Sequence, residues 1–143
     1  MRVVLDTNAL LSGLVTGETA PSRILNAWWN DRFHLIVSDH ILDGVDRALH
    51  KPYWRQRQDL LALESRLAAL GSNVERVEPA EGIHGVAPDD EDDLILATAV
   101  AADADYVVTG DKGLLALGEF RDIPIVSPRE FLDRLDAMER FDE

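Results

Sequence analysis

The stretch RVVLDTNALLSG, residues 2–13, places an acid directly after an apolar run. The segment VVL at 3–5 has the continuous apolar character of a strand that is buried on both faces of a sheet. Asp6 follows this strand at once. A carboxylate at the end of a core strand costs several kcal/mol if it stays charged, dry and unpaired. We therefore expect Asp6 to have partners that offset this cost.

Length and composition predict one globular domain that spans residues 1–143. The chain has 143 residues, of which 46% are hydrophobic and 29% are charged, as is ordinary for a globular protein. No apolar run approaches the roughly 20 residues of a membrane span, so no membrane association is expected. The N-terminus lacks the basic start and the long apolar stretch of a signal peptide, which predicts a cytoplasmic location.

Charge and the absence of cysteine narrow the possible ligands. The chain has no cysteine, which excludes disulfides and thiolate metal sites. A metal ion must therefore be held by oxygen atoms or by the four histidines. The net charge of −13 argues against a general nucleic-acid coat, which needs positive charge against phosphate.

Short apolar runs alternate with helical patterns along the chain. Strands are expected at 2–5, 34–38, 73–77, 105–110 and 123–127, and helices at 20–29, 39–50, 52–71, 92–103 and after Ser127. Ser38 and Ser127 are expected to cap the helices that follow them, and Gly71 to end the helix before it. The alternation predicts an α/β fold, with a mainly parallel five-stranded sheet covered by helices on both faces.

Three acidic sites that are far apart in sequence are expected at one edge of this sheet. Asp6 lies at the carboxyl end of the first strand, and Asp111 lies just past the strand at 105–110. The run PDDEDD, residues 88–93, begins the helix that precedes that strand. A helix between parallel strands starts at the edge where the strands end. Ligands of such folds bind at this edge, near the switch in strand order.

Clustered carboxylates repel one another and take up protons unless a cation neutralises them. Oxygen ligands without sulfur suit Mg²⁺ or Mn²⁺. Such ions activate water and stabilise charge on a phosphate during in-line displacement. Asn8 and Thr109 lie where they can orient the ligands or the water.

Each acid also has a simpler structural interpretation. Asp6 alone suits a turn in which its side chain accepts hydrogen bonds from nearby amides. The acids at 89–93 suit the first turn of a helix, where the helix dipole favours them, so one or two of the five are expected to be functional. Asp111 suits a cap for a short helix at 112–117. The combination is more specific than any single member, because all three sites must fall at the same edge.

Four motifs resemble the PIN-domain nucleases, and among them the branch of toxins from bacterial toxin–antitoxin pairs. They are DTN after the first strand, the acidic run leading into LILATA, ADYVVTGDKGLL, and VSDHILDGVDRALHKPYW. The resemblance covers nearly the whole chain. It implies a three-layer α/β/α sandwich and Mg²⁺- or Mn²⁺-dependent cleavage of single-stranded RNA. It also implies an antitoxin partner and a homodimer or higher oligomer. The matching positions imply metal-binding acids at Asp6, Asp92 and Asp111, supported by Asn8 and Thr109.

One position departs from the family pattern. The family normally has a Glu in the helix after the second strand, and the matching residue here is Gly44. On a helical wheel Gly44 flanks the apolar stripe, Asp43 points away from that stripe, and Asp46 lies on its opposite flank. Three interpretations follow from this departure. The nuclease is weak, or it uses Asp43 as a metal ligand after a local shift, or the chain is a PIN-like binding module without catalysis.

A phosphatase of the haloacid-dehalogenase type also begins with an Asp after its first strand. That chemistry needs a second Asp two residues later. Here the residue is Asn8, so this alternative ranks last.

The segment RALHKPYWRQR, residues 47–57, gathers cations and aromatic side chains. One interpretation is an RNA groove, with phosphates on the cations and a base stacked on an aromatic ring. The other is a solvated helix junction whose aromatic rings pack inward. The RNA-binding candidates are Arg47, Lys51, Tyr53, Trp54, Arg55 and Arg57.

Overall fold

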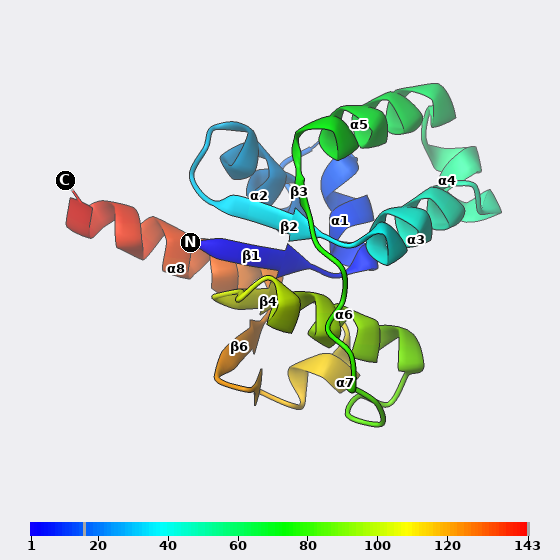
Figure 1. Cartoon of the computed structure of the whole chain (residues 1–143). Coiled ribbons are helices and arrows are strands. Elements are labelled where there is room, and N and C mark those ends of the chain that lie inside the picture. The colour runs from blue at the N-terminus through cyan, green and yellow to red at the C-terminus, as the bar shows by residue number, and fades with distance from the viewer. Residues whose placement is uncertain (16, 143) are drawn as a thin grey trace.

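The computed structural model describes residues 1–15 and 17–142, and its elements alternate between strands and helices (Figure 1). The strands are β1 Arg2–Leu5, β2 His34–Val37, β3 Glu75–Arg76, β4 Tyr106–Val108, β5 Glu119–Phe120 and β6 Ile123–Val126. The helices are α1 Thr7–Leu14, α2 Ala20–Trp29, α3 Asp39–Leu49, α4 Pro52–Arg57, α5 Leu60–Asn73, α6 Asp90–Ala101, α7 Lys112–Leu115 and α8 Pro128–Asp142.

The strands form one sheet in the order β3-β2-β1-β4-β6-β5. All neighbouring pairs are parallel except β5 and β6, which are antiparallel. Strand β1 lies in the middle, where Val3 pairs with Leu35 on one side and with Tyr106 on the other. The strand order therefore switches between β1 and β4, as the binding-site rule for α/β sheets requires.

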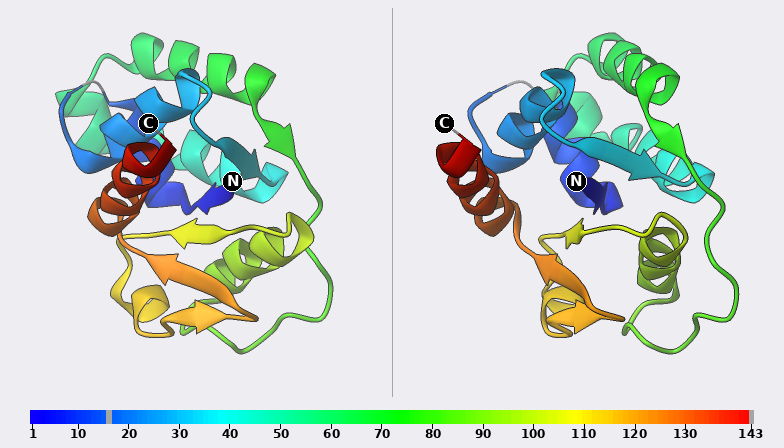
Figure 2. Two further views of the ribbon diagram at one scale, coloured as in Figure 1. Left: turned by 90° about the vertical axis from the view of Figure 1, so that its left-hand side faces the viewer. Right: turned by 60° about the vertical axis from the view of Figure 1, so that its left-hand side comes forward.

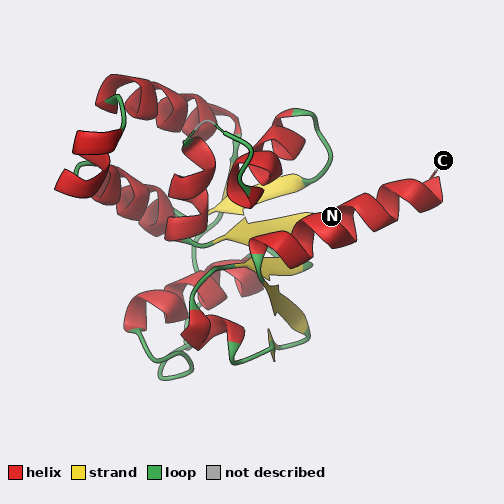
Figure 3. Ribbon diagram, turned by 180° about the vertical axis from the view of Figure 1, so that it is seen from behind, coloured by secondary structure: helices red, strands yellow, loops and turns green. Residues whose placement is uncertain are grey.

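Helices cover both faces of the sheet, which confirms the three-layer sandwich. Helix α6 packs against β1 and β4. Helices α1 and α2 contact each other, and α2 contacts α8. Figure 2 shows α8 and α6 on opposite faces, and Figure 3 shows the sheet from behind with helices on either side of it. Because β1 is enclosed by both layers, the side chains of the VVL run are fully buried.

The helix starts follow the polar side chains that the sequence offers. The predicted helix 20–29 matches α2 residue for residue. Ser38 accepts a hydrogen bond from the Ile41 N–H at 3.4 Å, so it caps α3 as predicted. Ser127 accepts one from the Glu130 N–H at 3.2 Å, at the start of α8.

The predicted single helix at 52–71 is wrong, because two helices occupy this segment. Helix α4 ends at Arg57, and α5 begins after Asp59. The Asp59 carboxylate accepts hydrogen bonds from two backbone N–H groups of the first turn of α5, which favours a new helix start. Gly71 does not end α5, which continues to Asn73.

Two further elements were not expected from the sequence. Helix α1 follows β1 directly, with Asp6 as its N-cap. Strand β5 forms a hairpin with β6 and makes the sheet six-stranded rather than five-stranded. The two loop residues of this hairpin, Arg121 and Asp122, have φ values of 49° and 67°. This left-handed conformation suits a tight hairpin but usually belongs to Gly or Asn, so the sequence carries no strong signal for it.

None of the described helices is both long enough and apolar enough to cross a lipid bilayer.

Candidate active site

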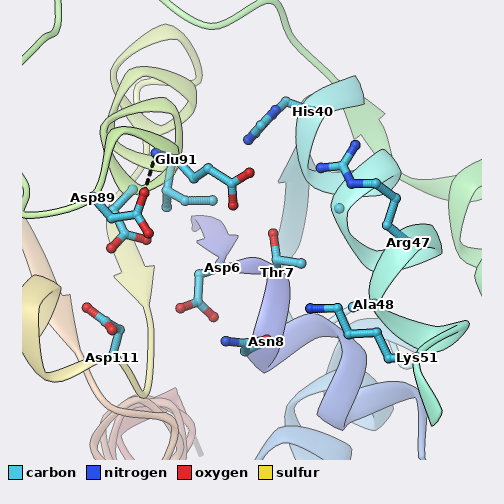
Figure 4. Close-up of a pocket in the computed structure, with 13 residues that line it drawn as sticks. Asp6, Thr7, Asn8, His40, Arg47, Ala48, Lys51, Asp89, Glu91 and Asp111 are labelled. Atoms are coloured by element: carbon cyan, nitrogen blue, oxygen red, sulfur yellow. Dashed lines mark hydrogen bonds between the residues drawn. The ribbon is translucent and has the colours of Figure 1, made fainter. Parts of the chain in front are cut away.

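A cavity of about 380 Å³ opens beyond the carboxyl ends of β1 and β4, at the switch in strand order (Figure 4). Its acidic residues come from the end of β1, from the start of α6 and from the segment after β4. The opposite wall is one face of α3 and the residue that precedes α4 (Figure 4). The lining residues are Asp6, Thr7, Asn8, His40, Gly44, Arg47, Ala48, Lys51, Asp89, Glu91, Asp92, Ile95 and Asp111.

Asp6 lies in this cavity between the two walls, and its side chain is only 5% exposed. Its Oδ1 accepts a hydrogen bond from the Ala9 N–H at 2.8 Å, and its Oδ2 accepts one from the Thr109 hydroxyl. These two bonds offset part of the cost of burying a carboxylate at the end of a core strand. Asp6 therefore caps α1 and also faces the cavity.

Thr109 connects the ends of β1 and β4. Its side chain is fully buried. Its O–H donates to the Asp6 Oδ2, and its oxygen accepts from the Asp111 N–H at 2.9 Å. One hydroxyl group therefore holds both the Asp6 carboxylate and the backbone of Asp111 in place. Asn8, at the start of α1, lines the cavity directly.

Asp111 combines the two roles that the sequence left open. Its Oδ2 accepts a hydrogen bond from the Leu114 N–H at 2.9 Å, so it caps α7. The residue is exposed, and it lines the cavity together with Asp6.

The acidic run divides its residues between structure and the cavity. Asp89 caps α6 by accepting a hydrogen bond from the Glu91 N–H at 3.0 Å. Asp93 is buried and accepts hydrogen bonds from the N–H groups of Gly85, Val86 and Ala87 at 2.8–3.1 Å. These three bonds hold the pKa of Asp93 below its usual value. Asp92 and Glu91 remain as the residues of the first turn of α6 that line the cavity.

The carboxylates of the cavity are close enough to shift one another's protonation. Partial burial, followed by the charges of Asp111, Asp89 and other nearby acids, raises the pKa of Asp92 to about 6. Burial also raises the pKa of Asp6, and the Asp111 charge adds to this rise, while the hydrogen bonds from Thr109 and Ala9 oppose it. The cavity therefore has a negative potential that a cation would relieve.

The donor set fits Mg²⁺ or Mn²⁺. All the candidate ligands are hard carboxylate oxygens, and they lie on three elements around one cavity. Within residues 1–15 and 17–142, no three His, Asp or Glu side chains are grouped closely enough to form a complete metal-binding site. Mg²⁺ does not need one, because it usually keeps several water ligands, through which nearby carboxylates can also hold it.

Gly44 lines the cavity, in agreement with the helical wheel. A Cβ atom at this position would lie 3.1 Å from the Thr7 Oγ1 and 3.2 Å from its Cγ2, so a side chain there requires Thr7 to move slightly. Asp43 is exposed and does not line the cavity. Asp46 lies 3.9 Å from the Nδ1 of His50. Asp46 does not line the cavity either.

The basic segment contributes two of its six candidates to the cavity. Arg47 and Lys51 line it, and so does His40, which sequence reasoning did not select. The signal for His40 was its spacing, because positions 40, 44 and 47 recur on one face of a helix. This face of α3 therefore presents cations opposite the carboxylates, as Figure 4 shows.

The other four candidates belong to α4, outside the cavity lining. The Arg57 guanidinium lies 4.1 Å from the centre of the Tyr53 ring and donates to the Tyr53 carbonyl at 3.0 Å. Trp54 packs partly buried against the core and contacts Tyr53 edge-to-face, with the ring centroids 5.1 Å apart. Arg55 is exposed. The helix-junction interpretation therefore describes Trp54 best, while Tyr53 remains 58% exposed.

The raised pKa of Asp92 predicts how the stability of the metal-free protein depends on pH. In the unfolded chain an Asp titrates near about 4, whereas in the folded protein the pKa of Asp92 is about 6. Between these values the folded state binds more protons, so its stability decreases as pH rises from about 4 to about 6. Asp92→Asn is expected to remove this decrease and to be more stable than wild type at pH 7.

Urea denaturation of both proteins in a chelator, at half-unit steps of pH, measures this effect. The difference between wild type and Asp92→Asn reports the contribution of Asp92 together with its charge interactions with the neighbouring acids. A difference that does not change between pH 4.5 and pH 7 would contradict the expectation.

Comparison with known proteins gives consistent findings. A family model described as PIN domain matches residues 2–113. An uncharacterised protein of Methanocaldococcus jannaschii is 24% identical over 148 residues, covering 95% of this chain and 92% of its own length. Two crystal structures share the fold. PAE2754 from Pyrobaculum aerophilum has a TM-score of 0.67 and 19% identity, covering 96% of this chain and 90% of its own. VapBC2 from Rickettsia felis, in a complex with a DNA fragment from its promoter, has a TM-score of 0.61 and 15% identity. The match covers 89% of this chain and 98% of that chain.

Proposed function

The chain belongs to the PIN domain family, and from that premise we propose that it is a metal-dependent endoribonuclease that cleaves single-stranded RNA. The observation that carries this proposal is the two-sided cavity. Carboxylates from the end of β1, the start of α6 and the segment after β4 face a cationic wall on α3. This arrangement suits a phosphodiester substrate, because one wall attracts a metal ion and the other attracts phosphate.

Asp6, Asp92 and Asp111 are the residues that would hold Mg²⁺ or Mn²⁺. When bound, such an ion neutralises charge on the phosphate and lowers the pKa of water. The protein's own contribution is orientation. Thr109 fixes one oxygen of Asp6 and the backbone of Asp111 through a single hydroxyl group. Asn8 is exposed beside Asp6, where its amide is available to orient the substrate or the attacking water.

The cationic wall is the proposed contact with the RNA backbone. Arg47 and Lys51 are exposed cations on the cavity side of the chain, and His40 extends the same face. In a chain of net charge −13, a local strip of this kind determines where a polyanion can approach. Tyr53, which is exposed on α4, offers a ring on which a base can stack.

We further propose that the protein is the toxin of a toxin–antitoxin pair. Support comes from the family membership and from the shared fold with VapBC2 of Rickettsia felis, which was crystallised on promoter DNA. On this proposal a cognate antitoxin inhibits the enzyme by covering the cavity, and the chain forms a homodimer or higher oligomer in the cytoplasm.

Cleavage of a panel of labelled single-stranded RNAs, with Mn²⁺ or with a chelator, tests the proposed activity. We expect fragments only with the metal ion, and slower cleavage of the same sequences in a duplex. Asp133→Asn provides a control for loss of one negative charge, because Asp133 is exposed on α8 and does not line the cavity. A complete absence of metal-dependent fragments across the panel would contradict the proposal and favour the binding module that Gly44 suggested.

The same proteins distinguish RNA binding from cleavage. Arg47→Ala combined with Lys51→Ala is expected to weaken RNA binding in chelator by about tenfold, through the loss of two exposed charge contacts. Each lost phosphate contact lowers the slope of log affinity against log salt by about 0.7 for a single strand, so the slope should fall by about 1.4. Arg55→Ala is the matched control, because Arg55 is a cation of the same segment outside the cavity lining. An unchanged salt slope in the double variant would show that the cations of the α3 wall do not contact the RNA backbone.

A further inference from the structure

The α3 face of the cavity has no carboxylate. Its residues at helical spacing are His40, Gly44, Arg47 and the neighbouring Lys51. The family resemblance places an acid at the position of Gly44. A carboxylate is therefore missing from this wall, and the exposed Asp43 of the same helix does not face the cavity.

Glu91 brings a carboxylate to the same cavity from the opposite side. It stands in the first turn of α6, directly before Asp92. In Figure 4 its side chain extends from α6 into the cavity and ends between His40 and Thr7, above Asp6. Glu91 and Asp92 line the same cavity as Asp6 and Asp111.

Hydrogen bonds on either side of Glu91 hold the first turn of α6 in place. The Asp89 Oδ1 caps α6 by accepting a hydrogen bond from the Glu91 N–H at 3.0 Å. Asp93, two residues later, turns the other way and is buried against the loop at 85–87. Glu91 and Gly44 line the same cavity as Thr7, the side chain that a Cβ at Gly44 would meet at 3.1 Å.

We propose that Glu91 is the fourth acidic ligand of the metal site and supplies from α6 the carboxylate that Gly44 removes from α3. The inference rests on the proposed function, because it concerns the same metal ion. It implies that the glycine does not make the site deficient. Of the five carboxylates that line the cavity, Asp89 caps α6, and Asp6, Glu91, Asp92 and Asp111 serve the cation, while the α3 wall is left entirely to phosphate.

Calorimetric titration of the full chain with Mn²⁺, without RNA, tests this role. Glu91→Gln is expected to lower Mn²⁺ affinity by about tenfold or more, as is typical when a residue that supports a metal is lost. Glu91→Asp keeps the charge but shortens the side chain by one methylene group, so it should also bind more weakly if reach matters. Asp90→Asn is the matched control, because it removes one charge from the same turn at a residue that does not line the cavity.

A double variant tests whether a carboxylate on α3 can replace the one that Glu91 supplies from α6. Gly44→Glu combined with Glu91→Gln is expected to recover most of the lost Mn²⁺ affinity, because it returns a carboxylate to α3. Gly44→Ala measures the steric effect of a Cβ against Thr7 by itself. Water proton relaxation by the bound Mn²⁺ gives an independent measurement, since loss of a protein ligand leaves room for an additional water on the ion.

The outcomes separate the two proposals. If wild type binds Mn²⁺ and both Glu91 variants bind it equally well, the role of Glu91 is overturned and the proposed nuclease stands. If Asp90→Asn loses as much affinity as Glu91→Gln, the effect is one of net charge and the ligand role is likewise overturned. If wild type does not bind Mn²⁺ at all, both proposals fail.

Discussion

Asp6→Asn is expected to lower the rate of metal-dependent RNA cleavage by about a hundredfold or more, since an ion that stabilises phosphate charge contributes several kcal/mol to the transition state. Asp6 is the most buried acid of the cavity, and it is held by Thr109 and by the Ala9 N–H. An amide keeps the shape and one acceptor oxygen but removes the negative charge. The measurement is the initial rate on one fluorescent single-stranded RNA at saturating Mn²⁺.

The fold of this variant should survive. Burial raises the pKa of Asp6, which means that its ionised form is disfavoured in the folded protein, so the neutral amide does not lose a stabilising charge. The amide gives up one of the two hydrogen bonds that the carboxylate accepts, which offsets this gain, so the thermal unfolding midpoint in chelator is expected to stay close to that of wild type. Asp133→Asn should change neither the rate nor the midpoint. An Asp6→Asn protein that keeps more than about a tenth of the wild-type rate would remove Asp6 from the proposed metal site.

Asp93→Ala is expected to lower the free energy of unfolding by about 2 kcal/mol or more, the range for leaving a buried donor without its charged acceptor, because Ala87 is buried while Val86 is half-buried and Gly85 is exposed. The Asp93 carboxylate is the acceptor for three consecutive backbone N–H groups, at Gly85, Val86 and Ala87. Truncation leaves these groups without their partner in the segment that leads into α6. Denaturation by urea at pH 7 measures the loss.

Two controls test this assignment. Asp90→Ala removes an exposed acid from the same turn and should cost less than about 0.5 kcal/mol, as is usual for surface positions. Unfolding measurements at low pH give a second test, because the hydrogen bonds hold the pKa of Asp93 below its usual value. The stability that Asp93 contributes is present above about pH 4 and is lost as pH falls through its folded pKa. The gap between wild type and Asp93→Ala should therefore narrow in acid; a constant gap would contradict the assignment.

Sequence patterns were sufficient for the elements whose signals are local. The VVL run before Asp6 predicted a central strand, and the fully buried β1 confirms it. Ser38 and Ser127 marked helix starts, because a hydroxyl at an N-cap satisfies backbone N–H groups within three residues. The hairpin of β5 and β6 escaped prediction for the opposite reason. Its turn uses two non-glycine residues at positive φ, which only their tertiary setting stabilises.

The sequence by itself determined that acids from the ends of two strands and from one helix start must meet at one sheet edge, because parallel strands and their connecting helices all run in fixed directions. Only the tertiary structure decided which acid of the run at 88–93 does what. Asp93 is buried as an acceptor for a loop, while Glu91 and Asp92 face the cavity. Neighbouring positions in such a run are nearly interchangeable as residue types. Their roles are therefore set by long-range packing, which fixes how α6 is rotated against β1 and β4. This rotation determines which side chains point into the cavity and which point at the core.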